Sequence, residues 1–327
     1  MLQWRRKQEV SLERGLLILI EQQCSAVRYM QFDQYRQFPD VIHGIFMRHG
    51  GYSQAPYSGL NVSLSVANER YEDAVRNRYL ALQSLDIARY PCATMWMIHS
   101  AQVVTLEGSE WLDWSADWPH RSYALDELGF PEGTTLQWTF KPRHQADAII
   151  TRQRGVALAM SSADCAPLLF YDPVQEVIGA THAGWRGTAR GIAAATVAAM
   201  SEQFGSRPAD IYAGIGPSIG PCCYEVSEDL RQIFLGQKEF TELPTEARFR
   251  ELVAASAVFE TVELPTKASL RLNLWKTNYQ QLLLAGLSAE HIESPEVCTS
   301  CASENFYSHR AEQGMAGRFP AIIALRD

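Results

Sequence analysis

The chain has 327 residues, of which 46% are hydrophobic, so it can bury an ordinary core in one large domain or two modest ones. Its 29 Lys and Arg against 37 Asp and Glu give a formal net charge of −8. A surface of that sign repels nucleic acid and anionic membranes, so neither is expected as a partner, and an anionic substrate must meet a local basic cluster.

Residues 1–28 are expected to form an N-terminal extension that is helical. The apolar run LLILI at 16–20 is too short for the core of a secretion signal, and Glu21 closes it without a small-residue cleavage site. No other segment approaches the length of a membrane-spanning helix, so we expect a cytoplasmic location.

The rest of the chain, 29–327, is expected to form one domain. Residues 41–66 show a short strand pattern, a Gly-Gly turn, a Ser/Pro/Gly loop and a second strand-like run, and 69–87 carry apolar residues at helical spacing. Strands are expected at 94–98 and 102–106. The tryptophan-rich segment 108–145 has no sustained period and is expected to be an insertion.

The second half alternates strand and helix patterns. Strands are expected at 147–151, 156–161, 166–171, 176–181, 211–215 and 321–325, and helices at 186–204, 227–235, 246–258 and 274–286. Strands and helices interleaved at irregular intervals favour an α+β fold of a single domain, with a mixed β-sheet sandwiched by helices.

Three short motifs each end an apolar strand with a metal-capable side chain among small residues. They are MWMIHSAQV with His99, SSADCAP with Cys165, and IGATHAGWRG with His182. Two imidazoles and one thiolate suit tetrahedral zinc with a fourth position left for water, as in catalytic sites. A single histidine of this kind is more often a hydrogen-bonded core residue. In HAGWRG, however, glycines, the Trp185 ring and the Arg186 guanidinium occur together, which a purely structural turn does not need.

Four motifs together resemble the laccase-domain family, once called multicopper polyphenol oxidases and now associated with purine nucleoside phosphorylase activity and with peptidoglycan editing. They are RHGGYSQAPYSGLN, SADCAPLLFYD, HAGWRG and GIGPSIGPCCYEV, and the resemblance runs from about residue 30 to the C-terminus. It implies one zinc held by His99, Cys165 and His182. It also implies phosphorolysis of adenosine, inosine, guanosine and S-methyl-5′-thioadenosine, with deamination of adenosine at the same site. Ser100 stands where the family usually has glycine, which is a small change.

Substrates of this kind are a nucleoside and phosphate, so further residues are candidates for binding them. Arg48 and Arg186 could hold phosphate, although each could equally form a surface ion pair. Asn61 could hold ribose or cap a turn. Asp164 is expected either to support Cys165 or to transfer protons, and a zinc-activated water would deaminate the purine.

The seven cysteines are expected to be reduced thiols or metal ligands, with Cys222 and Cys223 structural. HIESPEVCTSC echoes the deaminase signature, but its spacing is too short for that fold. A small second metal site at Cys298 and Cys301 stays open, although we expect this pair to be unligated because the family motif accounts only for Cys298.

Three functions follow from the sequence. The leading one is a zinc-dependent purine nucleoside phosphorylase with adenosine deaminase activity. The second is a hydrolase that removes wrongly incorporated serine from a UDP-MurNAc peptidoglycan precursor. The third is a non-catalytic purine-sensing or partner-binding protein with a structural, four-ligand metal. Eight histidines without a His-x-His pair disfavour a true multicopper oxidase, although adventitious copper (Cu²⁺) at the zinc site could oxidise phenols weakly.

Overall fold

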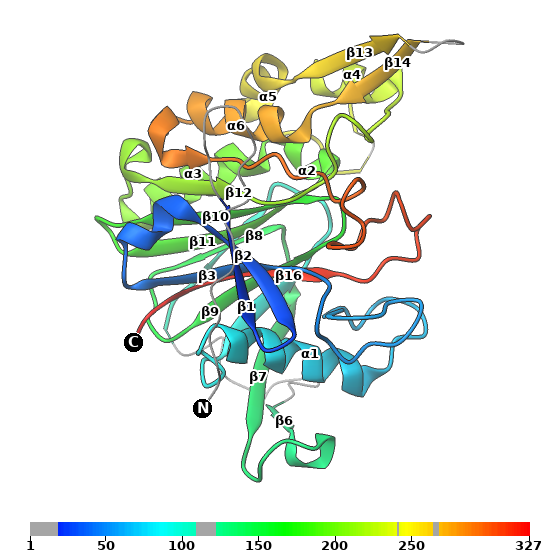
Figure 1. Cartoon of the computed structure of the whole chain (residues 1–327). Helices are drawn as coiled ribbons and strands as arrows, with labels where there is room; N and C mark the ends of the chain where they lie inside the picture. The colour runs from blue at the N-terminus through cyan, green and yellow to red at the C-terminus, as the bar shows by residue number, and fades with distance from the viewer. Residues whose placement is uncertain (1–18, 109–121, 241, 264–267) are drawn as a thin grey trace.

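The structure, a computed structural model, describes residues 19–108, 122–240, 242–263 and 268–327. Two β-sheets face each other at the centre of the molecule, with helices on both outer sides (Figure 1). In spatial order the larger sheet contains β1 (Leu19–Cys24), β2 (Val27–Phe32), β3 (Val41–Phe46), β16 (Phe319–Leu325), β9 (Ala157–Ser162), β4 (Cys92–Trp96), β7 (Thr135–Gln145) and β6 (Ser122–Ala124). The smaller contains β15 (Ile292–Glu293), β12 (Tyr212–Ile215), β10 (Ala166–Asp172), β11 (Val177–Ala183), β8 (Ala148–Thr151) and β5 (Val103–Leu106).

The helices cover the outer face of each sheet. Helix α1 (Tyr71–Ser84) lies on the larger sheet, and the other helices gather on the side of the smaller one (Figure 1). These are α2 (Trp185–Thr188), α3 (Ile192–Phe204), α4 (Glu228–Phe234), α5 (Arg250–Ser256) and α6 (Leu274–Leu284). A hairpin of β13 (Phe259–Glu263) and β14 (Ala268–Leu272) projects beside them. None of the described helices has both the length and the apolar character needed to cross a membrane.

Three apolar layers follow from strand alternation. In β16, Ile323 contributes to the layer between the sheets, whereas Ile322 and Ala324 contribute to the layer under α1. The smaller sheet likewise sends Ile178 toward the larger sheet and Val177 toward the helices. Strands buried on both faces read as continuous apolar runs, which is why FPAIIAL carries no polar alternation.

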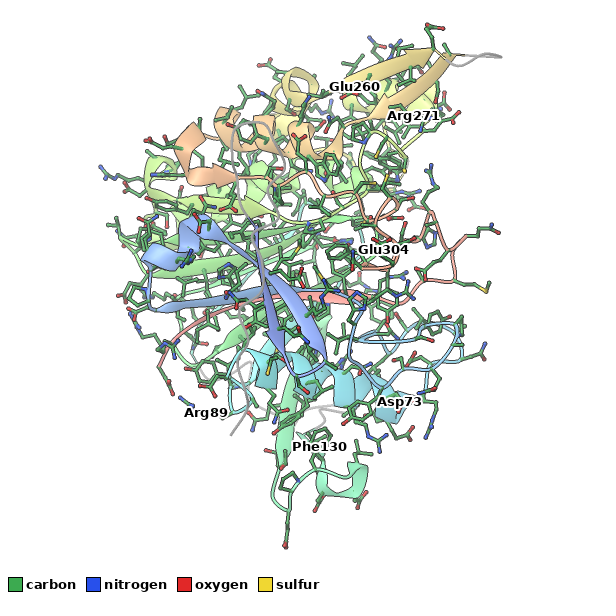
Figure 2. The ribbon with its side chains drawn as sticks, viewed as in Figure 1. Asp73, Arg89, Phe130, Glu260, Arg271 and Glu304 are labelled. Atoms are coloured by element: carbon green, nitrogen blue, oxygen red, sulfur yellow. The ribbon has the colours of Figure 1, made fainter. Side chains whose placement is uncertain are left out.

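Phe130 and the β13–β14 hairpin lie at opposite ends of the molecule (Figure 2). Phe130 packs edge to face on Tyr79 of α1, with ring centroids 4.7 Å apart (Figure 2). At the opposite end, Glu260 and Arg271 stand on the β13–β14 hairpin (Figure 2). The candidate site described below lies between these ends.

The predicted fold class, α+β with a mixed sheet between helices, is confirmed, and the sheet proves to be double. The helix expected at 186–204 is divided into α2 and α3, with Gly191 at φ +81° between them. The helical extension expected at 1–28 is wrong for its described part, because 19–24 form β1 and pair with β2. Residues 1–18 lie outside the described chain.

The segment expected as an insertion, 108–145, contributes to the sheet in its described part. β7 pairs in parallel with β4, with Cys92 opposite Trp138, and β6 pairs with β7 at the sheet edge. Trp138 is buried in the layer under α1. Residues 109–121 of this segment lie outside the described chain. The second strand-like run near 60–66 forms no strand.

Candidate metal centre

The three predicted ligand residues lie together where β10 begins and β11 ends. These antiparallel strands place Pro167 opposite His182, so Cys165, directly before β10, lies beside His182. His99 reaches the same place from the connection between β4 and β5. One ligand atom from each residue lies within 4.8 Å of the others, and the imidazole centroids are 5.1 Å apart. The structure therefore brings together the residues that the sequence assigned to one metal ion.

The local backbone makes room for this group. His99 has φ +59°, a left-handed conformation that is rare outside glycine and that the surroundings must hold. Its N–H donates to Asp147 Oδ1 at 3.0 Å, and its carbonyl accepts from Arg190 at 2.6 Å. At Gly184, a Cβ would lie 2.7 Å from Cys165 Sγ. The first glycine of HAGWRG, Gly184, is therefore required for a steric reason.

A buried carboxylate orients the group. Asp147 is fully buried directly before β8, and its Oδ1 lies 3.0 Å from His182 Nδ1. It also accepts the backbone N–H groups of His99 and Ser100. Because Nδ1 of His182 faces Asp147, Nε2 is the nitrogen that would bind a metal, and the metal would take the place of the Nε2 proton. The sequence analysis missed Asp147, although a lone aspartate in the segment ADAII is a visible signal, because a buried carboxylate needs partners.

Charges inside the group favour a thiolate. Burial by itself would raise the pKa of Cys165, but the charge of His182 and hydrogen bonds from His182 and His99 lower that pKa to about 6. Burial would likewise lower the pKa of His182, but the charge of Cys165 and the hydrogen bond to Asp147 raise it to about 10. At neutral pH Cys165 is therefore in the ionised form that binds metals.

Replacing Asp147 by asparagine is expected to weaken metal binding 10- to 100-fold, the range typical for the loss of a carboxylate that orients a histidine ligand. An amide can offer its NH₂ to Nδ1 and so disturb the tautomer of His182. Competition with a chromophoric chelator measures the affinity. Asp172→Asn is the matched control, because Asp172 is also fully buried but, among the described residues, accepts its hydrogen bonds from the backbone N–H groups of Val174 and Gln175. Equal affinity for both variants would contradict the role assigned to Asp147.

Asp164 adjoins Cys165, but its carboxylate belongs to another network. Its Oδ1 accepts from the hydroxyls of Thr299 and Ser308 at 2.6 and 2.7 Å, and its Oδ2 accepts from Arg310 N–H at 2.6 Å. These bonds fasten the segment before β16 to the turn that carries Cys165. Proton transfer by Asp164 stays a prediction.

The two arginines predicted for phosphate have different surroundings. Arg186 is exposed above the ring of Trp185, with its Cζ 4.4 Å from the ring centroid, and no carboxylate of the described residues forms an ion pair with it. Arg48 donates to Glu312 at 3.0 Å and to the carbonyl of Ser303 at 2.9 Å. Arg186 is therefore the arginine of this pair that is available to an incoming anion.

Asn61 is fully buried and its amide is used within the protein. Its Oδ1 accepts from the N–H groups of Ser63 and Arg318 at 3.1 and 2.8 Å, and its Nδ2 donates to Glu69 at 2.9 Å. The bond to Ser63, two residues further along the chain, forms the turn that the sequence offered as the alternative role. A contact with ribose stays a prediction.

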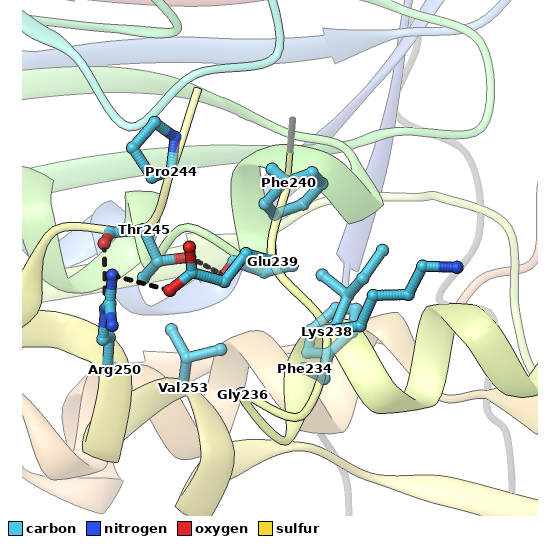
Figure 3. Close-up of a pocket in the computed structure, with 11 residues that line it drawn as sticks. Phe234, Gly236, Lys238, Glu239, Phe240, Pro244, Thr245, Arg250 and Val253 are labelled. Atoms are coloured by element: carbon cyan, nitrogen blue, oxygen red, sulfur yellow. Dashed lines mark hydrogen bonds and ion pairs between the residues drawn. The ribbon is translucent and has the colours of Figure 1, made fainter. Parts of the chain in front are cut away.

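One pocket of the described structure shares the residue Phe240 with the surroundings of the group. Phe240 stacks on Trp185 with centroids 5.9 Å apart, and Arg190 lies 3.7 Å from the Phe240 ring while holding the His99 carbonyl. Glu239 and Arg250, which pair at 3.1 Å, line this pocket together with Phe240 (Figure 3). None of the three ligand residues lines it. The sequence analysis missed both Arg190 and Phe240.

The fold and this group define a two-sheet α+β protein with a candidate metal centre of two histidines and one cysteine. A family model described as multi-copper polyphenol oxidoreductase laccase matches residues 42–326, and the chain belongs to that family. The chain is 33% identical over 290 residues to a Bacillus subtilis protein named purine nucleoside phosphorylase YlmD, which covers 88% of this chain and 90% of that protein.

Two further comparisons agree with the family assignment. A Homo sapiens protein named purine nucleoside phosphorylase LACC1 is 34% identical over 185 residues, or 55% of this chain and 38% of the human protein. The crystal structure of YlmD from Geobacillus stearothermophilus superposes with a TM-score of 0.70 at 28% identity, covering 98% of this chain and 100% of that one. The two chains therefore share one fold over nearly their whole length.

Proposed function

We propose that this chain is a zinc-dependent purine nucleoside phosphorylase. The observation that carries the proposal is the convergence of His99, Cys165 and His182 at one end of the smaller sheet. The proposal is further supported by the similarity of this chain, over most of both chains, to a protein named purine nucleoside phosphorylase. The substrates are adenosine, inosine, guanosine and S-methyl-5′-thioadenosine with phosphate, adenosine is also deaminated, and the location is cytoplasmic.

The donor set fits zinc. Two imidazole nitrogens and one thiolate are borderline-to-soft ligands, and the described residues place three such ligand atoms in the group, which leaves one position of a tetrahedron for water or substrate. His99, Cys165 and His182 would hold the ion, and Asp147 fixes the tautomer of His182. Bound there, zinc supplies Lewis-acid polarisation and acidifies water. A non-catalytic protein would instead need a fourth protein ligand.

The reaction also needs a place for an anion. Phosphorolysis forms a bond between a phosphate oxygen and ribose C1′ and breaks the bond from C1′ to the purine nitrogen, whose electron pair moves into the base together with a proton. Arg186 offers an exposed guanidinium close to the group, and its planar fork matches a phosphate. The ring of Trp185 lies beneath this guanidinium and holds it by a cation–π contact.

The test is chromatography of products from purified protein supplied with adenosine and phosphate, and then with each other nucleoside. The expected result is free base plus ribose 1-phosphate, or 5-methylthioribose 1-phosphate when the substrate is S-methyl-5′-thioadenosine. When adenosine is the substrate, inosine or hypoxanthine marks deamination. A parallel reaction with a serine-containing UDP-MurNAc precursor addresses the hydrolase alternative. Release of serine with no phosphate-dependent release of base would refute the phosphorylase.

A further inference from the structure

Four other cysteines converge outside the candidate metal centre. Cys222 and Cys223 lie in the turn after β12, and Cys298 and Cys301 lie after β15. Their four Sγ atoms lie within 4.8 Å of one another, with Cys301 Sγ 3.4 Å from the Sγ atoms of both Cys222 and Cys223. We propose that these four thiols, called here the tetrathiol cluster, form a second zinc site, structural in role.

The distances fit a shared ion better than a disulfide. A disulfide joins its sulfurs at about 2.05 Å, and all seven cysteines are free. Zinc binds thiolate at about 2.3 Å, so the sulfurs of a regular tetrahedron around it are about 3.8 Å apart. The separations among the four sulfurs, 3.4 Å for two pairs and at most 4.8 Å for the others, bracket that value.

Exposure argues against a packing role for the whole set. Cys298 is buried, as expected of a thiol that acts as a small apolar residue, but Cys222 and Cys301 are exposed and Cys223 is half-buried. Exposed thiols gain nothing from the core and are open to oxidation. The four thiols come from two turns that are far apart in the sequence, yet their sulfur atoms lie together. Binding of all four to one metal ion explains this arrangement.

The surroundings suit four thiolates. The N–H of Gly220 points at Cys298 Sγ, 3.3 Å away, the type of hydrogen bond that stabilises a coordinated sulfur. Four thiolates around zinc carry a net charge of −2, and two guanidinium groups lie beside them. Arg271 donates to the carbonyl of Cys222 at 3.3 Å, and Arg310 donates to the carbonyl of Cys223 at 3.0 Å. Arg271 stands on β14 (Figure 2), and its hydrogen bond to the Cys222 carbonyl places it next to the cluster.

The donor set separates this site from the candidate metal centre. Four sulfurs close the coordination sphere of zinc, so this site offers no position for water or substrate and is structural. It joins two turns that also hold Asp164. The N–H of Ile219 donates to the carbonyl of Asp164 at 2.9 Å, and the hydroxyl of Thr299 donates to the Asp164 carboxylate. Through these bonds to Asp164, zinc in the cluster would stabilise the turn that carries Cys165.

Metal analysis of protein purified with reductant and without chelator tests the proposal. Two equivalents of zinc per chain are expected, falling to one in the double variant Cys222→Ser/Cys301→Ser. The control Cys24→Ala, which removes a buried thiol outside both groups, should keep both equivalents. Unchanged zinc in the double variant would overturn the second site.

A second measurement does not depend on the folding of a cysteine variant. In His99→Ala/His182→Ala, which disables the candidate metal centre, zinc X-ray absorption should show four sulfur neighbours at about 2.3 Å. Nitrogen or oxygen neighbours, or no bound zinc, would overturn the proposal. So would five free thiols instead of seven after unfolding without reductant, because a disulfide would then occupy the cluster. None of these readouts requires phosphorylase activity, so this site and the proposed function can fail separately.

Discussion

Replacing His182 by alanine is expected to remove one equivalent of zinc and to abolish turnover of nucleosides. His182 is buried and joins the thiolate of Cys165 on one side to the carboxylate of Asp147 on the other. Loss of an orienting partner alone costs 10- to 100-fold in metal affinity, so loss of the donor atom should cost more than about 100-fold. Metal content and phosphate-dependent release of base measure the two effects.

The control for this change is His291→Ala. His291 stacks on Tyr212 with centroids 3.9 Å apart and lies outside both cysteine-containing groups. This variant should keep its zinc and its activity. If His182→Ala retained full phosphorolysis of adenosine with unchanged zinc affinity, the assignment of the centre would be wrong, whatever the outcome for His99→Ala.

The grouping of the three candidate ligand residues could be predicted because each lies at or just beyond the end of a short apolar strand, His99 after β4, Cys165 after β9 and His182 near the end of β11. Such strands are local patterns, and β10 and β11, joined by the turn DPVQ, pair as neighbours in the sequence. Their antiparallel pairing sets Cys165 beside His182 with no further information. The composition of the donor set then indicates the kind of metal.

Other parts depend on contacts that no local pattern shows. The β1–β2 hairpin turns at Ser25 and Ala26, with Ser25 at φ +58°, and neither residue is the Asn or Gly that signals such a turn. The apolar run before it favoured a helix instead. The pairing of β7 with β4 is equally invisible, because it joins distant segments in parallel.

The tetrathiol cluster also depends on contacts that no local sequence pattern shows. A two-residue bridge between Ser218 and Cys298 brings its two turns together. In the sequence the cysteines form two separate pairs, and each pair alone is weaker than a metal signature. The sequence shows Asp147 as an aspartate in an apolar segment, but it does not show which groups Asp147 contacts. Its partners come from the His99 turn and from β11.

Replacing Gly184 by alanine is expected to disrupt the candidate metal centre with little effect on the backbone. Gly184 has φ −71° and ψ 169°, an extended conformation that alanine adopts freely. The added Cβ would lie 2.7 Å from Cys165 Sγ and 3.2 Å from His99 Cδ2, so both ligands must move. Displacing two of the three donors should lower zinc affinity and activity by at least about 100-fold. This equals the upper end of the loss in metal affinity that follows when a residue that orients a ligand is mutated.

Gly179→Ala in the same strand as His182 is the matched control. Its Cβ would meet Ile150 at 3.2 Å and Phe170 at 3.3 Å, which are side-chain contacts of the core and not ligands of the centre. This variant should lose some thermal stability and keep its zinc affinity, whereas Gly184→Ala should lose zinc affinity first. If the two variants differed only in thermal stability, the close approach at Gly184 would have no part in metal binding, and the strand-to-helix turn would be a packing feature alone.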